Sequence, residues 1–303
     1  APRNLTLMQT LFLASLEAAL GVPEVFGYIF IFVLGACIGS FMNVVVYRVP
    51  NELSLLTSSA CPNCKNGIKF YHNVPIFGWL MLGGKCSSCK EPIAWRYPAV
   101  ELLTAMVFML TYWQIGFTVF LPVALVFVST MIALLFIDAE HMILPNVITY
   151  PLFVAVLIVR IIYPIVLSGY TFSDMAYSPI NQLAGYPGWA VSLAGGLFGA
   201  LVGGGSLWLV GAIWKALRGV DAMGLGDVKM MFGVGALLGW RVTILTIFLG
   251  AFSGALIGIA LVLKSKDRDL QTQLPFGIFL GIGSIVGLLF GERMIVWYLS
   301  TFS

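Results

Sequence analysis

The chain has 303 residues, of which 60% are hydrophobic and 10% are charged, and its formal net charge is +3. Soluble domains carry roughly 25% charged residues, so the composition excludes an ordinary soluble protein and indicates a polytopic membrane protein. The small net charge also argues against nucleic-acid binding.

Apolar stretches predict an all-α membrane protein with about eight transmembrane helices. The stretches lie near residues 25–46, 98–114, 118–137, 147–167, 190–213, 229–240, 242–263 and 275–300. The sixth is shorter than the roughly 20 residues that span a bilayer, so it either extends into the preceding GLGDVK or forms a broken helix. No basic segment with a cleavage site is visible near Ala1, so we do not expect a removable signal peptide.

The largest polar interruption, residues 47–97, contains two CxxC pairs, CPNC and CSSC. Their cysteines are Cys61, Cys64, Cys86 and Cys89. Two such pairs suit a tetrahedral Zn²⁺ site with four thiolate ligands and no open position, so the metal would be structural. It would stabilise a domain of about 50 residues, which is too small to bury a sufficient core. Two disulfides are the alternative, which a reducing compartment disfavours.

The distribution of lysine and arginine predicts that residues 47–97 are cytoplasmic. If eight helices span the membrane, most basic residues share that face, and the opposite face keeps only Arg3, Arg160, Arg241 and Arg293. The predicted organisation is an outer segment at 1–24, a first transmembrane helix at 25–46, the cytoplasmic zinc domain at 47–97 and a transmembrane domain at 98–303.

Two aspartates stand at the ends of hydrophobic runs, Asp138 in LLFIDAEHMILPN and Asp227 in AMGLGDVKMM. An ionisable residue in a membrane segment is by default a candidate functional residue. Two carboxylates held close together can share one proton and activate water, which is the chemistry of an aspartic protease. We expect Gly224 and Gly226 to let the backbone beside Asp227 approach a partner closely and adopt angles that other residues disfavour.

Two other classes of protein remain open on these features. A proton- or cation-coupled transporter would use the aspartate pair, but it predicts carboxylates near the bilayer midplane and leaves the cysteine domain unexplained. A membrane-anchored zinc module that recruits partners would need no aspartate pair.

Several longer strings occur in a fixed order along the chain. They are GSFMNVVVYRVP at 39–50, the two CxxC pairs, NVPIFGWLMLGGKC at 73–86, RYPAVELL at 96–103, IDAEHMILPN at 137–146, GLGDVK at 224–229 and LPFG at 274–277. In this order the chain resembles the bacterial type IV prepilin peptidases over nearly its whole length. That family is similar to other GxGD intramembrane aspartic proteases.

The resemblance implies a function and a set of residues. Members cleave the short basic leader of type IV prepilins and pseudopilins at the cytoplasmic face of the inner membrane, and many then methylate the new N-terminus with S-adenosylmethionine. The catalytic aspartates fall on Asp138 and Asp227, and 98–303 becomes the peptidase domain. The cysteine domain is associated with methylation and substrate handling, for which Gly84 and Glu101 are candidates; Glu101 could instead place its carboxylate at the membrane interface.

The chain departs from the family pattern at two places. Many relatives have a second aspartate two positions after the first catalytic one, where this chain has Glu140; we expect Asp138 to act, with Glu140 as a possible assistant. Residues 168–189 form an apparent insertion, which we expect on the outer face, away from the chemistry.

Overall fold

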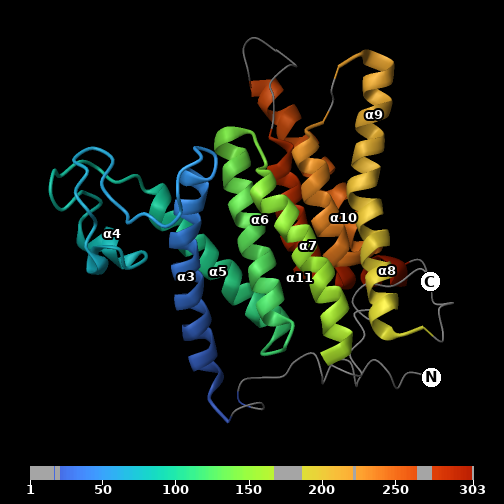
Figure 1. Cartoon of the computed structure of the whole chain (residues 1–303), viewed down its shortest axis with the longest axis horizontal. Helices are drawn as coiled ribbons and strands as arrows, with labels where there is room; N and C mark the ends of the chain where they lie inside the picture. Colours follow the sequence, from blue (N-terminus) through green and yellow to red (C-terminus); the bar gives the residue numbers. More distant parts are fainter. Residues whose placement is uncertain (1–16, 18–20, 167–185, 221–222, 265–274, 302–303) are drawn as a thin grey trace. The chain divides into compact units, whose positions relative to one another are not determined.

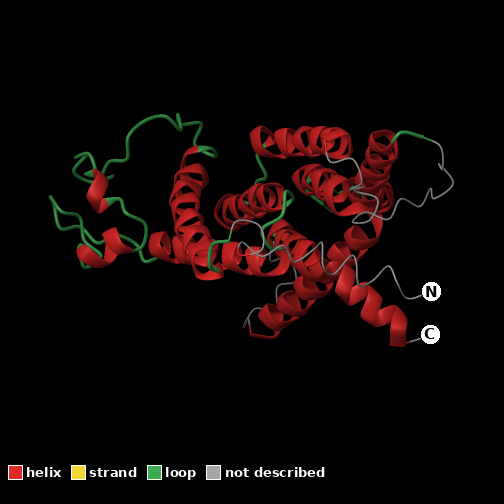
Figure 2. Ribbon diagram, turned by 90° about the horizontal axis from the view of Figure 1, so that it is seen from below, coloured by secondary structure: helices red, strands yellow, loops and turns green. Residues whose placement is uncertain are grey.

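The structure is a computed structural model that describes residue 17 and residues 21–166, 186–220, 223–264 and 275–301. Within these ranges every regular element is a helix, apart from two isolated bridges that join Ala60 to Gly67 and Lys85 to Pro92 (Figure 2). The predicted all-α class is therefore confirmed. Nearly all of the expected outer segment at 1–24 and of the insertion at 168–189 lies outside the described residues.

The chain divides into two compact units, Ala1–Ala133 and Leu134–Ser303, and the division falls inside helix α6. In the first unit α3 packs along α5, because glycines on α3 let the two backbones approach closely. A Cβ on Gly35 would lie 2.7 Å from the Cα of Ala105. The helices of this part of the chain are α3 (Glu24–Arg48), η1 (Phe70–His72), α4 (Phe77–Met81), α5 (Arg96–Ile115) and α6 (Leu121–His141).

In the second unit α10 is the central helix and packs against α7, α8, the π-helical turn η2 and α11 (Figure 1). Small residues again allow close packing, as expected for helices in lipid. The elements are α7 (Asn146–Val166), α8 (Gly188–Ala200), η2 (Leu201–Gly205), α9 (Ser206–Arg218), α10 (Leu225–Lys264) and α11 (Phe276–Thr301).

Seven helical stretches of the described chain are long and apolar enough to cross a membrane, against about eight expected. The count differs because the stretches 229–240 and 242–263 belong to one helix, α10. Large apolar side chains are also exposed along the helices, for example Phe26 and Phe30 on α3, where a soluble protein would carry polar residues. The chain is therefore a multi-pass membrane protein.

Helix α10 is broken at Gly239, whose φ of 74° and ψ of 168° are not helical. The break separates a first arm, residues 225–238, from a longer second arm. Both expectations for the short sixth stretch hold, since the helix begins already at Leu225 and is interrupted at Gly239. Arg160, which the sequence places among the charges of the outer face, has a fully buried side chain that contacts α10.

Candidate active site

Asp138 lies in the last turn of α6 and is 6% exposed. Its Oδ2 accepts a hydrogen bond of 3.1 Å from the backbone N–H of Ile278. Ile278 belongs to the first turn of α11, where backbone N–H groups have no partner within the helix. The carboxylate of Asp138 thus satisfies the start of another helix, and this contact fixes its orientation.

Asp227 lies in the first turn of α10 and is 8% exposed. A carboxylate at this position interacts favourably with the helix dipole. The backbone N–H of Asp227 donates to the carbonyl oxygen of Gly224 at 3.2 Å. The side-chain oxygen Oδ1 is buried and accepts no hydrogen bond from the described residues. A buried acceptor of this kind suits a water molecule or a bound peptide.

The two carboxylates converge on Gly277, in the first turn of α11. A Cβ placed on Gly277 would lie 2.7 Å from Oδ2 of Asp138 and 3.1 Å from Oδ1 of Asp227. The structure therefore brings together the two aspartates that the sequence singled out, although 89 positions separate them. The missing side chain of Gly277 leaves the space that they share.

The neighbouring glycines behave differently from one another. A Cβ on Gly226 would lie 2.8 Å from the Cβ of Leu144, so Gly226 does permit a close approach. Gly224 shows no such crowding, and neither residue has a positive φ. The expectation that these glycines supply unusual backbone angles is wrong for both.

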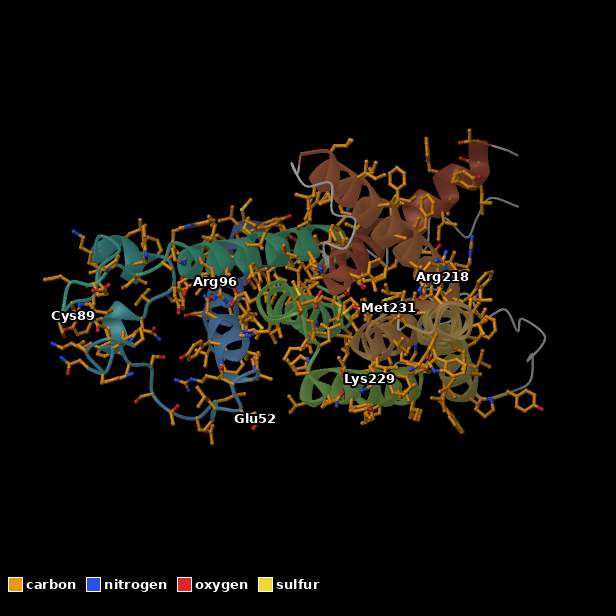
Figure 3. The ribbon with its side chains drawn as sticks, turned by 90° about the horizontal axis from the view of Figure 1, so that it is seen from above. Glu52, Cys89, Arg96, Arg218, Lys229 and Met231 are labelled. Atoms are coloured by element: carbon orange, nitrogen blue, oxygen red, sulfur yellow. The ribbon has the colours of Figure 1, made fainter. Side chains whose placement is uncertain are left out.

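Other polar residues lie beside the aspartates. Glu140 is exposed where Asp138 is buried, so Asp138 is the carboxylate that faces Asp227. Lys229, two positions after Asp227, donates a 2.8 Å hydrogen bond to Asn146 Oδ1 and lies 5.3 Å from the ring centroid of Tyr150 (Figure 3). These contacts join the start of α10 to the start of α7. Neither contact was apparent from the sequence.

The four cysteines of the loop between α3 and α5 form one cluster. Their Sγ atoms all lie within 4.8 Å of one another, with 3.8 Å between Cys61 and Cys89 and 4.0 Å between Cys64 and Cys86. A tetrahedral Zn²⁺ with Zn–S bonds of about 2.3 Å requires S···S distances of about 3.8 Å. The residues therefore fit zinc, and all four are free thiols rather than disulfides.

The two CxxC pairs are built as copies of one turn. In each, the first cysteine donates its N–H to a carbonyl five residues ahead, and its own carbonyl accepts from the lysine four residues ahead. Those lysines, Lys65 and Lys90, both have positive φ. The turn directs backbone N–H groups at the sulfurs. Hydrogen bonds from Cys89 and Ser88 lower the pKa of the Cys86 thiol to about 6.

Gly84 and Glu101, the candidates for methylation, both have structural contacts. Gly84 has a positive φ of 68°, and a Cβ there would lie 2.8 Å from the Trp79 ring. Glu101 is buried, and its Oε2 accepts the N–H of Ile76 at 2.6 Å. Ile76 has a φ of 65°, unusual for a β-branched residue, so Glu101 stabilises a strained turn before α4. A role of these two positions in methylation stays a prediction.

By its fold and site the chain belongs to the class of membrane-embedded aspartic proteases: several membrane helices hold two buried aspartates beside one another. Comparison with protein-family models then specifies the family. Residues 33–115 match the bacterial peptidase A24 N-terminal domain, and residues 125–259 match the type IV leader peptidase family. The chain belongs to this family.

Curated relatives cover nearly the whole chain. A prepilin leader peptidase/N-methyltransferase of Pseudomonas aeruginosa is 34% identical over 88% of this chain and 91% of the relative. Proteins of the same name from Aeromonas hydrophila and Legionella pneumophila are 31% and 30% identical, over 95% and 90% of this chain and 98% and 95% of the relatives. No solved structure gives a significant match.

Proposed function

We propose that this chain removes the leader peptide of type IV prepilins or pseudopilins, with Asp138 and Asp227 as the catalytic pair. The observation that carries the proposal is the convergence of both carboxylates on Gly277 in a buried site. The substrate class is supported by the relatives, which are named as prepilin leader peptidases.

Hydrolysis would proceed without a covalent intermediate. One aspartate is ionised and takes a proton from water while the other is protonated and donates to the oxygen of the scissile carbonyl. The water oxygen bonds to the carbonyl carbon, and the roles reverse when the tetrahedral intermediate expels the amine. The N–H of Ile278 holds Asp138 in one orientation, so that Asp227 supplies the unpartnered oxygen nearest the shared space.

The chemistry belongs at the cytoplasmic face of the bacterial inner membrane. The support is the excess of lysine and arginine in residues 47–97 and around Asp227. These segments share a face when each of the five candidate membrane spans that precede Asp227 crosses the membrane once. Asp138 and Asp227 stand at helix ends rather than near helix centres. A transporter would place its coupling carboxylates near the bilayer midplane, so this placement favours the protease.

The metal has a structural role in this proposal. Cys61, Cys64, Cys86 and Cys89 would hold Zn²⁺ and keep the loop between α3 and α5 folded, because few apolar residues there are buried. Four thiolates leave no ligand position for water, so hydrolysis depends on the aspartates alone.

A second activity, methylation of the new N-terminal amine, is supported by the relatives' name N-methyltransferase. S-adenosylmethionine would supply the methyl group. Because Gly84 and Glu101 are engaged in structural contacts, we assign no residue of this chain to that step.

The test is incubation of the purified protein with a tagged prepilin, with mass spectrometry of the product. We expect a single mass loss that corresponds to the leader, and a further gain of one methyl group when S-adenosylmethionine is added. An intact prepilin, together with proton flux in proteoliposomes, would favour the transporter instead. An intact prepilin that binds stably without flux would favour the zinc module that recruits partners.

A further inference from the structure

Arg160 is a fully buried arginine inside a membrane helix, and the proposed chemistry makes no use of it. It lies in α7 with 0% of its side chain exposed, and it is the largest fully buried side chain among the described residues. Burial of an arginine at membrane depth is costly, so such residues are rare and mark functional positions. The contacts of Arg160 therefore indicate what its function is.

Arg160 donates to two backbone carbonyls at the end of the first arm of α10. Nε donates to the oxygen of Ala236 and Nη2 to the oxygen of Leu237, both at 2.9 Å. In an unbroken helix these carbonyls would accept from the N–H groups four residues ahead, but the break at Gly239 interrupts that pattern. The guanidinium thus caps the C-terminal end of the helical arm that carries Asp227 at its other end.

Helix α8 packs against Arg160 and against the end of the first arm. A Cβ on Gly196 would lie 3.3 Å from the Ala236 oxygen and 3.4 Å from Nε of Arg160, so the absence of a side chain there makes room for the guanidinium. A Cβ on Gly199 would collide with the backbone of Gly235. The end of the first arm is therefore held by packing on one side and by Arg160 through hydrogen bonds.

We propose that Arg160 is a positioning residue for the peptidase site: by capping the first arm of α10 it fixes the tilt of that arm and hence the distance of Asp227 from Asp138. The inference rests on the proposed function, because it assumes that both aspartates act on the peptide bond. Helix α7 would then contribute to catalysis indirectly, through the contact of Arg160 with α10.

The geometry gives the expected size of the effect. About 12 residues separate the break from Asp227, a lever of about 18 Å at 1.5 Å per residue. A tilt of about 3° at the capped end then moves Asp227 by about 1 Å. A displacement of that size in a catalytic group can lower the rate by about 100-fold. Since Arg160 contacts the end of the first arm that is remote from Asp227, the loss should appear in kcat.

The test compares Arg160→Met and Arg160→Lys with the wild-type protein in a kinetic assay of prepilin cleavage in detergent. Met removes both donors at similar length, and we expect kcat to fall at least tenfold with KM changed less than twofold. Lys retains donors for the same carbonyls, so we expect it to restore part of kcat. Arg241→Met is the matched control, because it removes an arginine next to the break on the second arm, which does not carry Asp227.

Wild-type kcat in Arg160→Met, or equal losses in Arg160→Met and Arg241→Met, would overturn the inference. If Arg160→Met does not fold, Arg160→Lys decides, because one flexible ammonium cannot reproduce the fixed geometry of the two donors Nε and Nη2. A folded Lys variant with reduced kcat and unchanged KM supports positioning, whereas wild-type kinetics would overturn the inference. Asp227→Asn is measured in parallel. Cleavage by Asp227→Asn would contradict the proposed function itself. If Asp227→Asn is inactive and Arg160→Met has wild-type kinetics, only the positioning role of Arg160 is contradicted.

Discussion

Gly277 is the residue at which the two candidate catalytic carboxylates meet. Its missing side chain leaves open a point that lies 2.7 Å from Asp138 Oδ2 and 3.1 Å from Asp227 Oδ1. A methyl group there would occupy the space between the aspartates and displace any water held by both. The position is therefore a steric probe of the site that leaves both carboxylates in the chain.

We expect Gly277→Ala to reduce prepilin cleavage by about 100-fold or more, since displacement of a catalytic group by about 1 Å has effects of that size. The variant should retain its thermal unfolding temperature to within a few degrees. Gly211→Ala is the control, because the nearest atom to a Cβ there, on Met223, is 3.9 Å away. Wild-type cleavage by Gly277→Ala would show that the space beside Gly277 is not the reaction site.

The cysteine cluster gives a prediction about pH. In the metal-free protein the pKa of Cys86 is lowered to about 6 by hydrogen bonds from Cys89 and Ser88. The N–H of Glu91 lowers the pKa of Cys89, but burial and the neighbouring thiols outweigh it and raise that pKa to about 11. A lowered pKa means that the thiolate is present at neutral pH and disappears as the pH falls through about 6.

Alkylation of the zinc-stripped protein should therefore modify Cys86 faster than Cys89 at pH 7, with the rate at Cys86 falling to half near pH 6. Peptide mapping by mass spectrometry measures both rates. Equal rates at Cys86 and Cys89 at pH 7 would contradict the arrangement of N–H groups around Cys86.

At the residue scale the sequence predicted what local chemistry determines. The cost of a carboxylate in an apolar run pointed to Asp138 and Asp227, and CxxC spacing pointed to the metal cluster. It did not predict the part of Gly277 or Ile278, because their contacts with Asp138 join positions about 140 residues apart. The sequence made Glu101 a candidate for methylation or substrate handling. Its hydrogen bond to the turn at Ile76 is seen only in the folded structure.

At the scale of elements the seam between α8 and the first arm of α10 depends on paired glycines. A Cβ on Gly199 would collide with the carbonyl oxygen of Gly235, and a Cβ on Gly235 with that of Gly199. Backbone atoms cannot move aside as flexible side chains do, so the two helices would have to separate.

We expect Gly199→Ala to lower the free energy of unfolding by about 1–3 kcal/mol, the usual cost of overpacking. Thermal unfolding in detergent measures the loss. Gly205→Ala, a few residues ahead in η2, should be tolerated because nothing lies within 4 Å of its Cβ. Similar unfolding temperatures for the two variants would be inconsistent with the seam.

The folded structure of the loop between α3 and α5 should depend on its bound metal. We expect removal of zinc by a chelator to make this loop more sensitive to limited proteolysis, since few apolar residues there are buried to stabilise it. The backbone hydrogen bonds within each CxxC turn do not need the metal and should persist. The membrane helices should stay folded by circular dichroism. A loop that resists protease equally with and without zinc would show that the metal is dispensable for its structure.

The sequence predicted the elements better than their interruptions. Apolar runs indicated the helices, and the short sixth run indicated a break, because 12 residues do not span a bilayer. The position of the break at Gly239 and its capping by Arg160 were not predicted, since the carbonyls concerned belong to a helix about 76 residues further along the chain. The sequence pointed to Arg160 only as one of the charges of the outer face.

At the scale of the whole molecule the chain combines an N-terminal unit that carries the cysteine cluster with a C-terminal unit that carries both aspartates. We assign hydrolysis to the C-terminal unit and a structural metal to the N-terminal unit. If that division is right, loss of a catalytic aspartate should leave zinc binding unchanged.

The most direct test of the central claim is prepilin cleavage by purified Asp227→Asn and Asp138→Asn, measured by mass loss at the leader beside zinc content. We predict no detectable cleavage by either variant, with the zinc stoichiometry and unfolding temperature of the wild-type protein. Cleavage of the leader by either folded variant would contradict the assignment of Asp138 and Asp227 as the catalytic pair.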